Sequence, residues 1–405
     1  MTVFVLGGAQ TDFARRWSRE EKDLFDGMGE ALRAGAERAR VELGEVDVTH
    51  VGNFVGERFR GQGHLGGLVA SLDPALRGKP SSRHEAACAS GSVAALAAMA
   101  DLEAGYYDLA CVLGVEEMRN VPGDEAAAHL GAAAWVGREA EGARYVWPFL
   151  FSELLEHVDR AHGVKGEHLW AFAKQAFENA RRNPDAQTRR WTFGDASFTA
   201  DREANPPIEG RLRRQDCAQI TDGAAAVFFA AERFASAWAK RRGVDLEAVP
   251  RLLGWGHRVG PMSLQEKLDE GGAYLFPHVK DAVDHARRRA EVADVGGVDA
   301  IELHDCFTIT AYALIEHLGI TAPGRAFEAI EDGSIALGGR IPVNPSGGLI
   351  GLGHPVGATG VRMLVDAWRQ TTGQAGEMQV EGARRVQTLN IGGSATTAVS
   401  FLVGT

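Results

Sequence analysis

The chain of 405 residues contains few cysteines and no long apolar run. Its four cysteines are too few for the disulfide framework of a secreted protein, and their spacings do not match a zinc site. No apolar run is long enough to cross a membrane as a helix. We therefore expect a protein of the cytoplasm, where reducing conditions keep a thiol usable, and no membrane association.

We also expect no targeting segment, and the chain has no excess of positive charge. Residues 1–5 enter an expected strand without the basic segment and cleavage site of a signal peptide, and residues 402–405 carry no peroxisomal tripeptide. Lys and Arg number 43 against 54 Asp and Glu, a formal net charge of -11, which argues against nucleic acid as a partner. A polyanionic substrate would need a local basic patch.

Glycine, by contrast, is abundant. The chain has 50 glycines, whereas an average usage of about 7% predicts about 28. Such a content indicates many tight turns and close backbone approaches. The apolar content of 45% and charged content of 24% are ordinary for a globular protein, and the length allows two or three domains.

Strand-like and helix-like segments alternate over the first 118 residues. Strands are expected at 3–6, 47–55 and 109–115, with an amphipathic helix at 21–43. This alternation predicts an α/β fold with a mostly parallel sheet and helices on both faces. The pattern stops near Arg119. The segment 121–207 contains helical runs and many aromatics; we interpret it as an insertion over the active site, whose aromatics mostly form a small core of their own.

The alternating pattern returns at 222–230 and continues to the end of the chain. Strands expected at 298–303, 385–390 and 395–403, with a helix at 279–292, repeat the order of the first part. We interpret this as a weak internal duplication of elements rather than of sequence.

Cys88 is the strongest candidate for a reactive residue. It lies among small residues, in Ala87–Gly91, before an Ala-rich helix, and the positive end of that helix favours the thiolate. In an arbitrary Ala-rich segment a structural cysteine would be the commoner interpretation. A second segment, 344–360, changes that balance. Its Gly-rich run ends in His354 before another helix, and His354-x-x-Gly357 has the spacing of Cys88-x-x-Gly91.

Two further segments add to this set. Leu303–Phe307 contains His304 and Cys306, and Leu389–Ser394 is a Gly-rich turn. Together the four segments supply a nucleophile, bases and oxyanion donors, the groups that acyl transfer needs.

The motifs Cys88–Ser90, His304–Phe307 and Gly353–Pro355, in this order, resemble those of the thiolases. The tetrapeptide His-Asp-Cys-Phe is similar to that of the sterol-carrier-protein X type, and the resemblance covers nearly the whole chain. It implies a thiolase-like duplicated five-layer α-β-α-β-α fold with an inserted loop domain. The implied domains are an N-terminal half at 1–118 and 208–245, the loop domain at 119–207 and a C-terminal half at 246–405.

The resemblance and the chemistry of the residues together imply roles. Cys88 would attack a thioester and hold the acyl group, with His354 as its base. His304 would donate a hydrogen bond to the thioester oxygen, unless it is a buried histidine satisfied by Asp305. Cys306 would move the proton at the α-carbon of the attacking acyl-CoA. The backbone N–H groups of Cys88 and Gly392 would form a second oxyanion hole.

One position departs from the family pattern. Other thiolase branches carry a cysteine two residues before Gly392, where this chain has Asn390, so the effect of Asn390 on the full Claisen or thiolysis cycle stays open. For coenzyme A phosphates the candidates are Arg211, Arg213 and Arg214, with Arg189 and Arg190 as others; a solvated charge run is the alternative. Cys111 and Cys217 are expected to be structural.

These observations predict a coenzyme A-dependent acyltransferase of the thiolase class. It would cleave 3-ketoacyl-CoA thiolytically or run the reverse Claisen condensation through a Cys88 acyl-enzyme. Coenzyme A would be a substrate, with no metal or permanently bound cofactor, and we expect at least a homodimer by resemblance. One alternative is a condensing or C–C-cleaving enzyme of the ketoacyl synthase or aldolase type, working with a small OB-fold-type partner protein. Another is a non-catalytic scaffold subunit.

Overall fold

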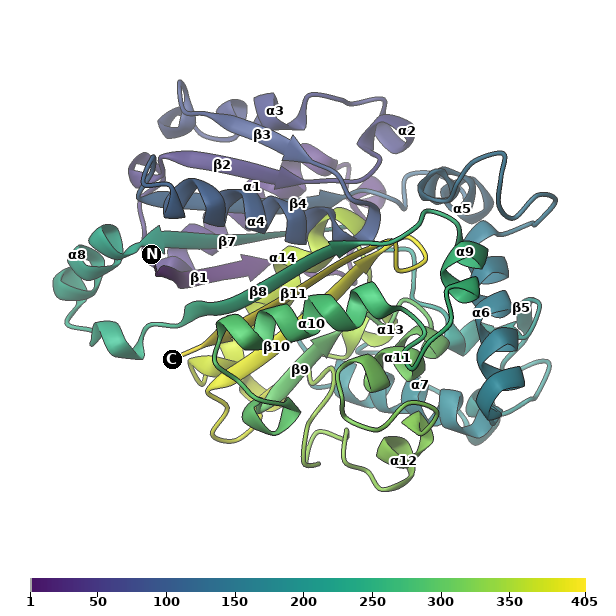
Figure 1. The fold of residues 1–405 in the computed structure, drawn as a ribbon. Coiled ribbons are helices and arrows are strands. Elements are labelled where there is room, and N and C mark those ends of the chain that lie inside the picture. Colours follow the sequence, from purple (N-terminus) through teal and green to yellow (C-terminus); the bar gives the residue numbers. More distant parts are fainter. Residues whose placement is uncertain (1) are drawn as a thin grey trace.

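A central sheet of nine strands dominates the computed structural model, which describes residues 2–405 (Figure 1). The strand order is β3-β2-β4-β7-β1-β8-β11-β10-β9. The bounds are β1 (Val3–Gln10), β2 (Val48–Gly52), β3 (Ser81–His84), β4 (Leu109–Glu116), β7 (Gly223–Ala231), β8 (Arg251–Val259), β9 (Ala300–Leu303), β10 (Arg385–Gly392) and β11 (Thr397–Gly404).

The sheet is mixed, so the expectation of a mostly parallel sheet is wrong. β2 pairs in parallel with β3 and with β4, and β9 with β10, whereas the other five neighbouring pairs are antiparallel. The physical reason is that β7 returns antiparallel between β4 and β1, and that β10 and β11 form a hairpin closed by a short turn. Neither the return nor the hairpin follows from strand–helix alternation.

Five layers stack through the molecule (Figure 1). The helices α4 (Ser90–Glu103) and α14 (Thr359–Thr371) form the middle layer, and α14 packs against β1 and β7 on one side and against β10 and β11 on the other. The outer layers are α1 (Leu24–Ala39) on β1, β4 and β7, and α10 (Pro277–Arg289) on β8 and β11. This arrangement confirms the five-layer α-β-α-β-α fold.

The alternating side chains of β1 pack against helices on both faces of the sheet. Val3 and Val5 belong to the apolar cluster of α4 and α14, whereas Phe4 and Leu6 belong to the cluster under α1. Because successive side chains of a strand point to opposite faces, a strand that is buried on both faces is apolar throughout.

The two halves have the same topology. The order β3-β2-β4-β7-β1 is matched in the second half by β9-β10-β11-β8, and an isolated parallel bridge between Ile301 and Val343 takes the place of β3. α4 precedes β4 as α14 precedes β10, and α1 follows β1 as α10 follows β8. The expected duplication is therefore present in the topology.

Element bounds differ from the expected ones by a few residues. The helix expected at 21–43 is α1, whose N-cap Asp23 accepts hydrogen bonds from the N–H groups of Phe25 and Asp26. The remaining helices are α2 (Gly56–Arg60), α3 (Leu65–Leu72), α5 (Gly123–Leu130), α6 (Val146–His162), α7 (Gly166–Ala180), α8 (Glu232–Arg242), α9 (Leu264–Asp269), α11 (Thr308–His317), α12 (Ala326–Glu331) and α13 (Gly348–Gly351), and a small separate sheet pairs β5 (Pro207–Glu209) with β6 (Leu212–Arg213).

The segment between β4 and β7 packs on the second half of the fold. Phe151 of α6 stacks on Phe307, with ring centroids 4.5 Å apart, and shares one apolar cluster with Ile309 of α11. The expectation of a separate small core is therefore wrong for these aromatics; a local group of Phe177, Phe193 and Phe198 does form. The domain boundaries at residues 118 and 208 stay a prediction.

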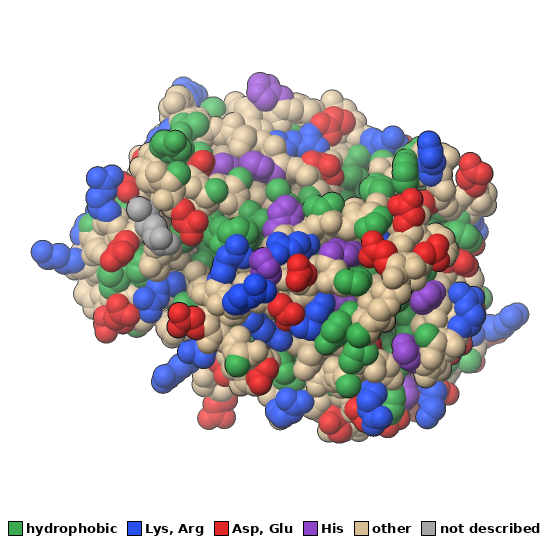
Figure 2. All heavy atoms as spheres, in the orientation of Figure 1, with side chains coloured by type: hydrophobic (Ala, Val, Ile, Leu, Met, Phe, Trp, Pro, Cys, Tyr) green, Lys and Arg blue, Asp and Glu red, His purple; other side chains and the backbone are tan. Residues whose placement is uncertain are grey.

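The surface in Figure 2 carries acidic and basic side chains intermixed over the face shown. Among residues 2–405, no helix combines the length and the apolar character that a membrane crossing requires.

Candidate active site

Cys88 lies on a sharp turn, Ala87–Ala89, immediately before α4. Ala87 has a φ of 50°, which is in the left-handed region, and its N–H donates to the Glu85 carboxylate at 2.6 Å. The Ser90 side chain holds the turn from the helix side, because its Oγ accepts the Ala86 N–H at 2.9 Å and donates to the Ala87 carbonyl at 2.6 Å. This strained turn fixes the position of the Cys88 sulfur.

His354 is oriented by two threonines. Its backbone N–H donates to Thr221 Oγ1 at 2.9 Å, and its Nδ1 lies 2.7 Å from Thr359 Oγ1. Because the Thr359 hydroxyl donates to the Pro355 carbonyl at 3.0 Å, its oxygen is left to accept the Nδ1–H of His354. The other ring nitrogen, Nε2, then carries the lone pair that a general base needs.

His304 follows β9 and contacts Asn390 of β10. The Asn390 amide nitrogen lies 3.0 Å from His304 Nδ1, whereas Nε2 has no partner among residues 2–405. Asp305 does not bond to this ring: its carboxylate accepts the Leu349 N–H at 2.6 Å. The alternative of a buried histidine satisfied by Asp305 is therefore wrong.

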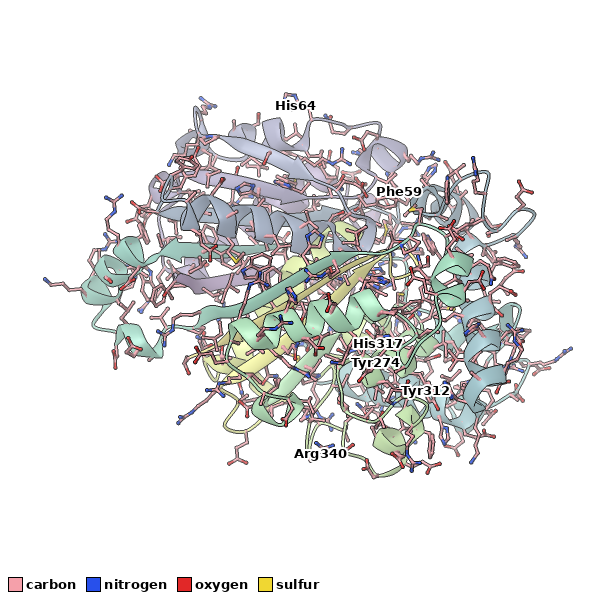
Figure 3. All side chains as sticks on the ribbon, in the orientation of Figure 1. Phe59, His64, Tyr274, Tyr312, His317 and Arg340 are labelled. Carbon is pink, nitrogen blue, oxygen red and sulfur yellow. The ribbon has the colours of Figure 1, made fainter. Side chains whose placement is uncertain are left out.

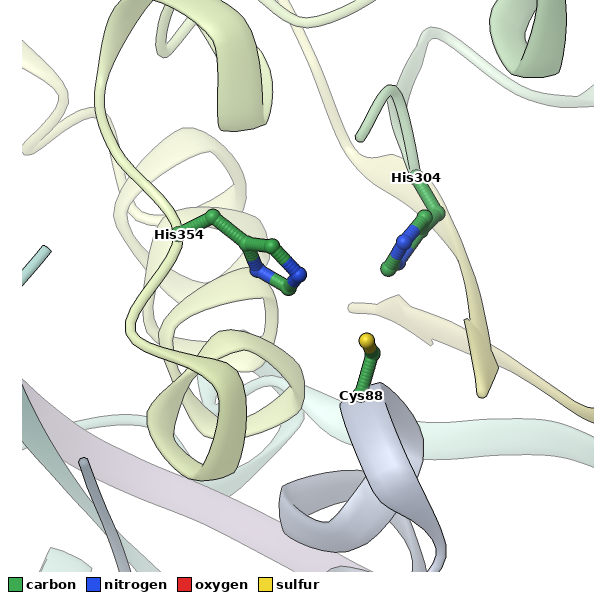
Figure 4. A group of neighbouring side chains, drawn as sticks. All are labelled: Cys88, His304 and His354. Carbon is green, nitrogen blue, oxygen red and sulfur yellow. The ribbon is translucent and has the colours of Figure 1, made fainter. Parts of the chain in front are cut away.

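Figure 4 shows Cys88, His304 and His354 pointing toward one another from three separate segments. The Cys88 sulfur and one nitrogen of each ring lie within 4.8 Å of one another, and the rings are perpendicular with centroids 5.3 Å apart. A set of this size and composition has ligands that suit Zn²⁺, and it equally suits a nucleophile with a base and an oxyanion donor.

The electrostatics of the site keep the thiol and the imidazole neutral before substrate binds. Burial raises the pKa of Cys88 to about 12, although a hydrogen bond from the Gly393 N–H acts in the opposite direction. Burial, with a smaller effect of the Arg362 charge, lowers the pKa of His354 to about 3. The thiolate expected from the helix dipole is thus not the resting state, because desolvation outweighs the dipole.

Cys306 faces the same cavity as Cys88. Its sulfur lies 3.6 Å from Thr310 Oγ1, and burial, with a further contribution from neighbouring Cys88, raises the pKa of its thiol. Cys217, expected to be structural, also lines this cavity, with its sulfur 3.3 Å from the Arg213 carbonyl oxygen. Cys111 is fully buried in β4.

Gly392 ends β10 against the turn that carries Cys88. A β-carbon on Gly392 would lie 2.2 Å from the Ala86 carbonyl oxygen, so only glycine allows this approach. The N–H group that lowers the pKa of Cys88 most belongs to the next residue, Gly393, which sequence reasoning did not single out. The two consecutive glycines, Gly392 and Gly393, are the sequence feature that could have indicated this N–H group.

Among the three candidate phosphate-binding arginines, Arg214 alone borders the cavity. Arg211 is paired with Asp159 at 2.6 Å and with Glu156 at 3.5 Å, and Arg213 donates to the Asn205 carbonyl at 2.8 Å. Arg189, another candidate, is paired with Asp12 at 2.7 Å.

The cavity beside Cys88 has a volume of about 360 Å³. Its walls are mostly apolar, and the inserted segment supplies many of them; the lining includes Phe54, Met118, Trp147, Phe151 and Phe307. Polar groups are few, with Tyr145, Arg214 and Gln219 among them. The cavity therefore suits a largely apolar group bound next to the nucleophile.

Comparison with known families and proteins agrees with this geometry. Residues 3–190 match "Thiolase, N-terminal domain", and residues 263–405 match "Thiolase C-terminal domain-like". Acetyl-CoA acetyltransferase of Methanothermobacter thermautotrophicus is 33% identical over 98% of this chain and 97% of its own length. Sterol carrier protein 2 of Homo sapiens is 29% identical over 99% of this chain and 72% of its own length.

Two solved structures share the fold. The Ltp2-ChsH2(DUF35) aldolase superposes with a TM-score of 0.78 at 18% identity, covering 100% of this chain and 97% of that one. Acetyl-CoA acetyltransferase from Syntrophomonas wolfei superposes with a TM-score of 0.71 at 20% identity, covering 100% and 98%. At these identities the likeness establishes the fold alone.

Proposed function

The chain belongs to the thiolase family and is an acyltransferase of that class, and we propose that Cys88 carries the acyl group it transfers. The reaction is thiolytic cleavage of a 3-ketoacyl-CoA or the reverse Claisen condensation. The observation that supports these roles is the convergence of the Cys88 sulfur with ring nitrogens of His304 and His354, beside an apolar cavity that Cys88, Cys306 and His354 line.

In the first half-reaction, Cys88 attacks the thioester carbon of the donor while its proton passes to His354 Nε2. Because the thiol and the imidazole are both neutral at rest, this proton leaves as the sulfur attacks rather than beforehand. The departing coenzyme A sulfur takes the proton back from His354. The N–H groups of Cys88 and of Gly392 or Gly393 stabilise the oxyanion of this step.

In the second half-reaction, the acyl group leaves Cys88 for the α-carbon of a second acyl-CoA. Cys306 first passes its own thiol proton to His354 Nε2 and then, as a thiolate, removes the proton from that carbon. His304 and the protonated His354 stabilise the enolate oxygen. The carbanion attacks the acyl carbon, the C–S bond to Cys88 breaks, and the Cys88 sulfur takes the proton held by His354, so that both cysteines are thiols again. Thiolysis runs the same steps in reverse.

Coenzyme A is a substrate in this proposal, and no permanently bound cofactor is needed. Arg214 is the phosphate or pantetheine contact that we favour, since it lies at the cavity and is not ion-paired within residues 2–405. We also propose a homodimer and a cytoplasmic location. A reducing compartment fits the proposed chemistry, because that chemistry requires Cys88 and Cys306 as thiols.

A second candidate is C–C cleavage with a small partner protein. The fold neighbour described as the Ltp2-ChsH2(DUF35) aldolase favours it. An aldol cleavage does not need an acyl-enzyme, so the presence of Cys88 with an oriented base favours the thiolase reaction instead.

Intact-mass measurement separates these candidates. Native protein and Cys88→Ala are mixed with acetyl-CoA and, separately, with acetoacetyl-CoA. We expect an acetyl adduct on the native chain that free coenzyme A discharges, and none on the variant. Absence of an adduct with these donors and with longer acyl-CoAs would overturn the proposal and favour the aldolase or the scaffold.

A further inference from the structure

We propose that Asn390 is a positioning residue that fixes the tautomer of His304, so that His304 presents an Nε2–H donor to the substrate. This inference rests on the proposed function and concerns its C–C bond step. It assigns a role to the one position at which the chain departs from the thiolase pattern.

The geometry is a buried chain of hydrogen bonds from α4 to the reaction centre. The Ser92 hydroxyl donates to Asn390 Oδ1 at 2.9 Å, and Asn390 Nδ2 lies 3.0 Å from His304 Nδ1. The three side chains are almost completely buried, with exposed fractions of 1%, 0% and 0%. Water therefore does not compete for these groups, and the chain holds one arrangement of donors and acceptors.

Close packing around the amide restrains it further. A β-carbon on Gly360 would lie 2.3 Å from Ser92 Oγ and 3.0 Å from Asn390 Oδ1, so the helix α14 closes over this pair. Ser92 is four residues after Cys88, and the relay is therefore anchored on α4, the helix that directly follows the nucleophile.

The tautomer follows from the chemistry of the amide. An amide NH₂ group donates and has no lone pair to offer, so His304 Nδ1 accepts and the ring proton resides on Nε2. Nε2 has no partner among residues 2–405. The His304 ring points toward Cys88 and His354, and one of its nitrogens lies within 4.8 Å of the Cys88 sulfur. A buried N–H without an acceptor is rare, and the thioester oxygen of the second substrate would be its acceptor.

His354 and His304 then have complementary states. Thr359 leaves the lone pair of His354 on Nε2, while Asn390 places the proton of His304 on Nε2. Burial, with the neighbouring His354 and Arg362, holds the pKa of His304 well below its usual value, so the donor is a neutral ring. One ring is prepared as a base and the other as a hydrogen-bond donor.

The replacement of cysteine by asparagine therefore has a structural consequence. A cysteine at 390 could exchange a proton with the α-carbon, whereas Asn390 cannot, and this task is left to Cys306. The Asn390 amide instead donates a hydrogen bond to His304 Nδ1 and so fixes the tautomer of the ring. A thiol, which is both a weak donor and a weak acceptor, would not fix it.

Nitrogen NMR of ¹⁵N-histidine-labelled native protein tests the tautomer directly, with His304→Gln to assign the signal among the 13 histidines. We expect His304 Nδ1 to be unprotonated and Nε2 to be protonated. A protonated Nδ1 in the native protein would overturn the inference. This measurement requires no change at Asn390 and so does not depend on the folding of a variant there.

Kinetics of Asn390→Leu test the role. We expect this variant to slow the C–C step by about 10²–10³-fold, the effect of losing one oriented oxyanion donor. Acylation of Cys88 by acetyl-CoA should change by less than about tenfold. Gln387→Leu is the matched control, because it removes another buried amide of β10, bonded to Arg287 and Ser400. Ser92→Ala removes the hydroxyl that bonds to the Asn390 amide and should lose part of the C–C step.

The outcomes distinguish the inference from the function on which it rests. If native protein forms no acyl adduct, the proposed function fails. If the adduct forms and Asn390→Leu slows acylation and the C–C step by the same factor, Asn390 has no positioning role. The same conclusion follows if the variant slows neither step. In both cases the inference alone fails.

Discussion

Gly91 lies so close to Gly357 that a β-carbon on Gly91 would be 2.7 Å from the Gly357 carbonyl oxygen. Gly91 is three residues after Cys88, and Gly357 is three residues after His354. Gly357 faces the first half in turn, because a β-carbon there would lie 2.5 Å from the Val115 carbonyl oxygen of β4. The missing side chain of Gly91 lets the start of α4 touch the backbone just before α14. That contact brings the nucleophile of one half beside the base of the other.

Replacing Gly91 with alanine tests this contact. Because the neighbour is backbone rather than a flexible side chain, we expect Gly91→Ala to lower the free energy of unfolding by about 1–3 kcal/mol and to slow acylation of Cys88. Urea unfolding and intact-mass kinetics measure the two effects. Gly44→Ala is the control, since a β-carbon there meets nothing within 4 Å. Equal behaviour of the two variants would contradict the interpretation.

The hydroxyl of Thr359 should matter for acylation because it orients His354. Thr359→Val keeps the shape but removes the acceptor for Nδ1–H, so the ring loses its preferred tautomer. We expect acylation of Cys88 to slow by about 10²-fold, as for other oriented histidine bases. Thr359→Ser retains the oxygen and should stay near the native rate. Native-like acylation by the valine variant would show that Thr359 does not orient the base.

The raised pKa of Cys88 predicts its reactivity toward iodoacetamide. With a thiol pKa of about 12 and a His354 pKa of about 3, the thiolate fraction increases about tenfold per pH unit across pH 7–9.5. The alkylation rate of the Cys88 peptide, followed by mass spectrometry, should rise over this range. A rate that is already high and constant from pH 6 would indicate a preformed thiolate–imidazolium pair instead.

The arginines near the cavity should differ in their effect on coenzyme A binding. Arg214→Ala should raise KM for acyl-CoA by about 5–30-fold, the loss of about 1–2 kcal/mol from a charged hydrogen bond, with kcat little changed. Arg211→Ala removes a residue already paired with Glu156 and Asp159 and should leave KM within about twofold. Steady-state kinetics of the two variants measure KM and kcat. A larger increase in KM for Arg211→Ala would indicate that the phosphates bind near α6 instead.

His317 should make folding stability depend on pH. It is buried near Tyr274, as Figure 3 shows, with Nδ1 bonded to the Ala313 carbonyl and Nε2 accepting the Phe276 N–H. Burial lowers its pKa from 6.5 to about 4. Between these values the unfolded chain holds the proton and the folded chain does not, so acid favours unfolding.

The native protein should therefore lose stability relative to His317→Gln as pH falls. From pH 7.5 to pH 5 the difference in free energy of unfolding between the two should shrink by about 2 kcal/mol. Using the difference cancels the opposite effect of Glu116 and Glu302, whose pKa values burial raises to about 7. Urea unfolding at the two pH values is the measurement, and a constant difference would contradict it.

Local patterns in the sequence were sufficient to identify the candidate catalytic residues and to predict most helices and strands. Cys88, His304, Cys306 and His354 were recognisable because each lies in a short motif at the end of a strand or the start of a helix. Strand–helix alternation predicted the α/β class, and the repeated order of elements predicted the duplication. These features depend on neighbours in the chain, which a sequence displays directly.

The pairing of strands and the protonation of the site depended on contacts between residues far apart in the chain. The antiparallel return of β7, the packing of the inserted aromatics on Phe307 and the bonding of Asn390 to His304 join segments separated by up to hundreds of residues. Burial, which keeps Cys88 a thiol, is likewise a property of the assembled layers. The sequence itself therefore determined the catalytic motifs and the order of helices and strands. Only the tertiary structure decided the direction of the strands, the tautomer of His304 and the pKa of Cys88. These three properties depend on neighbours in space and on the exclusion of water.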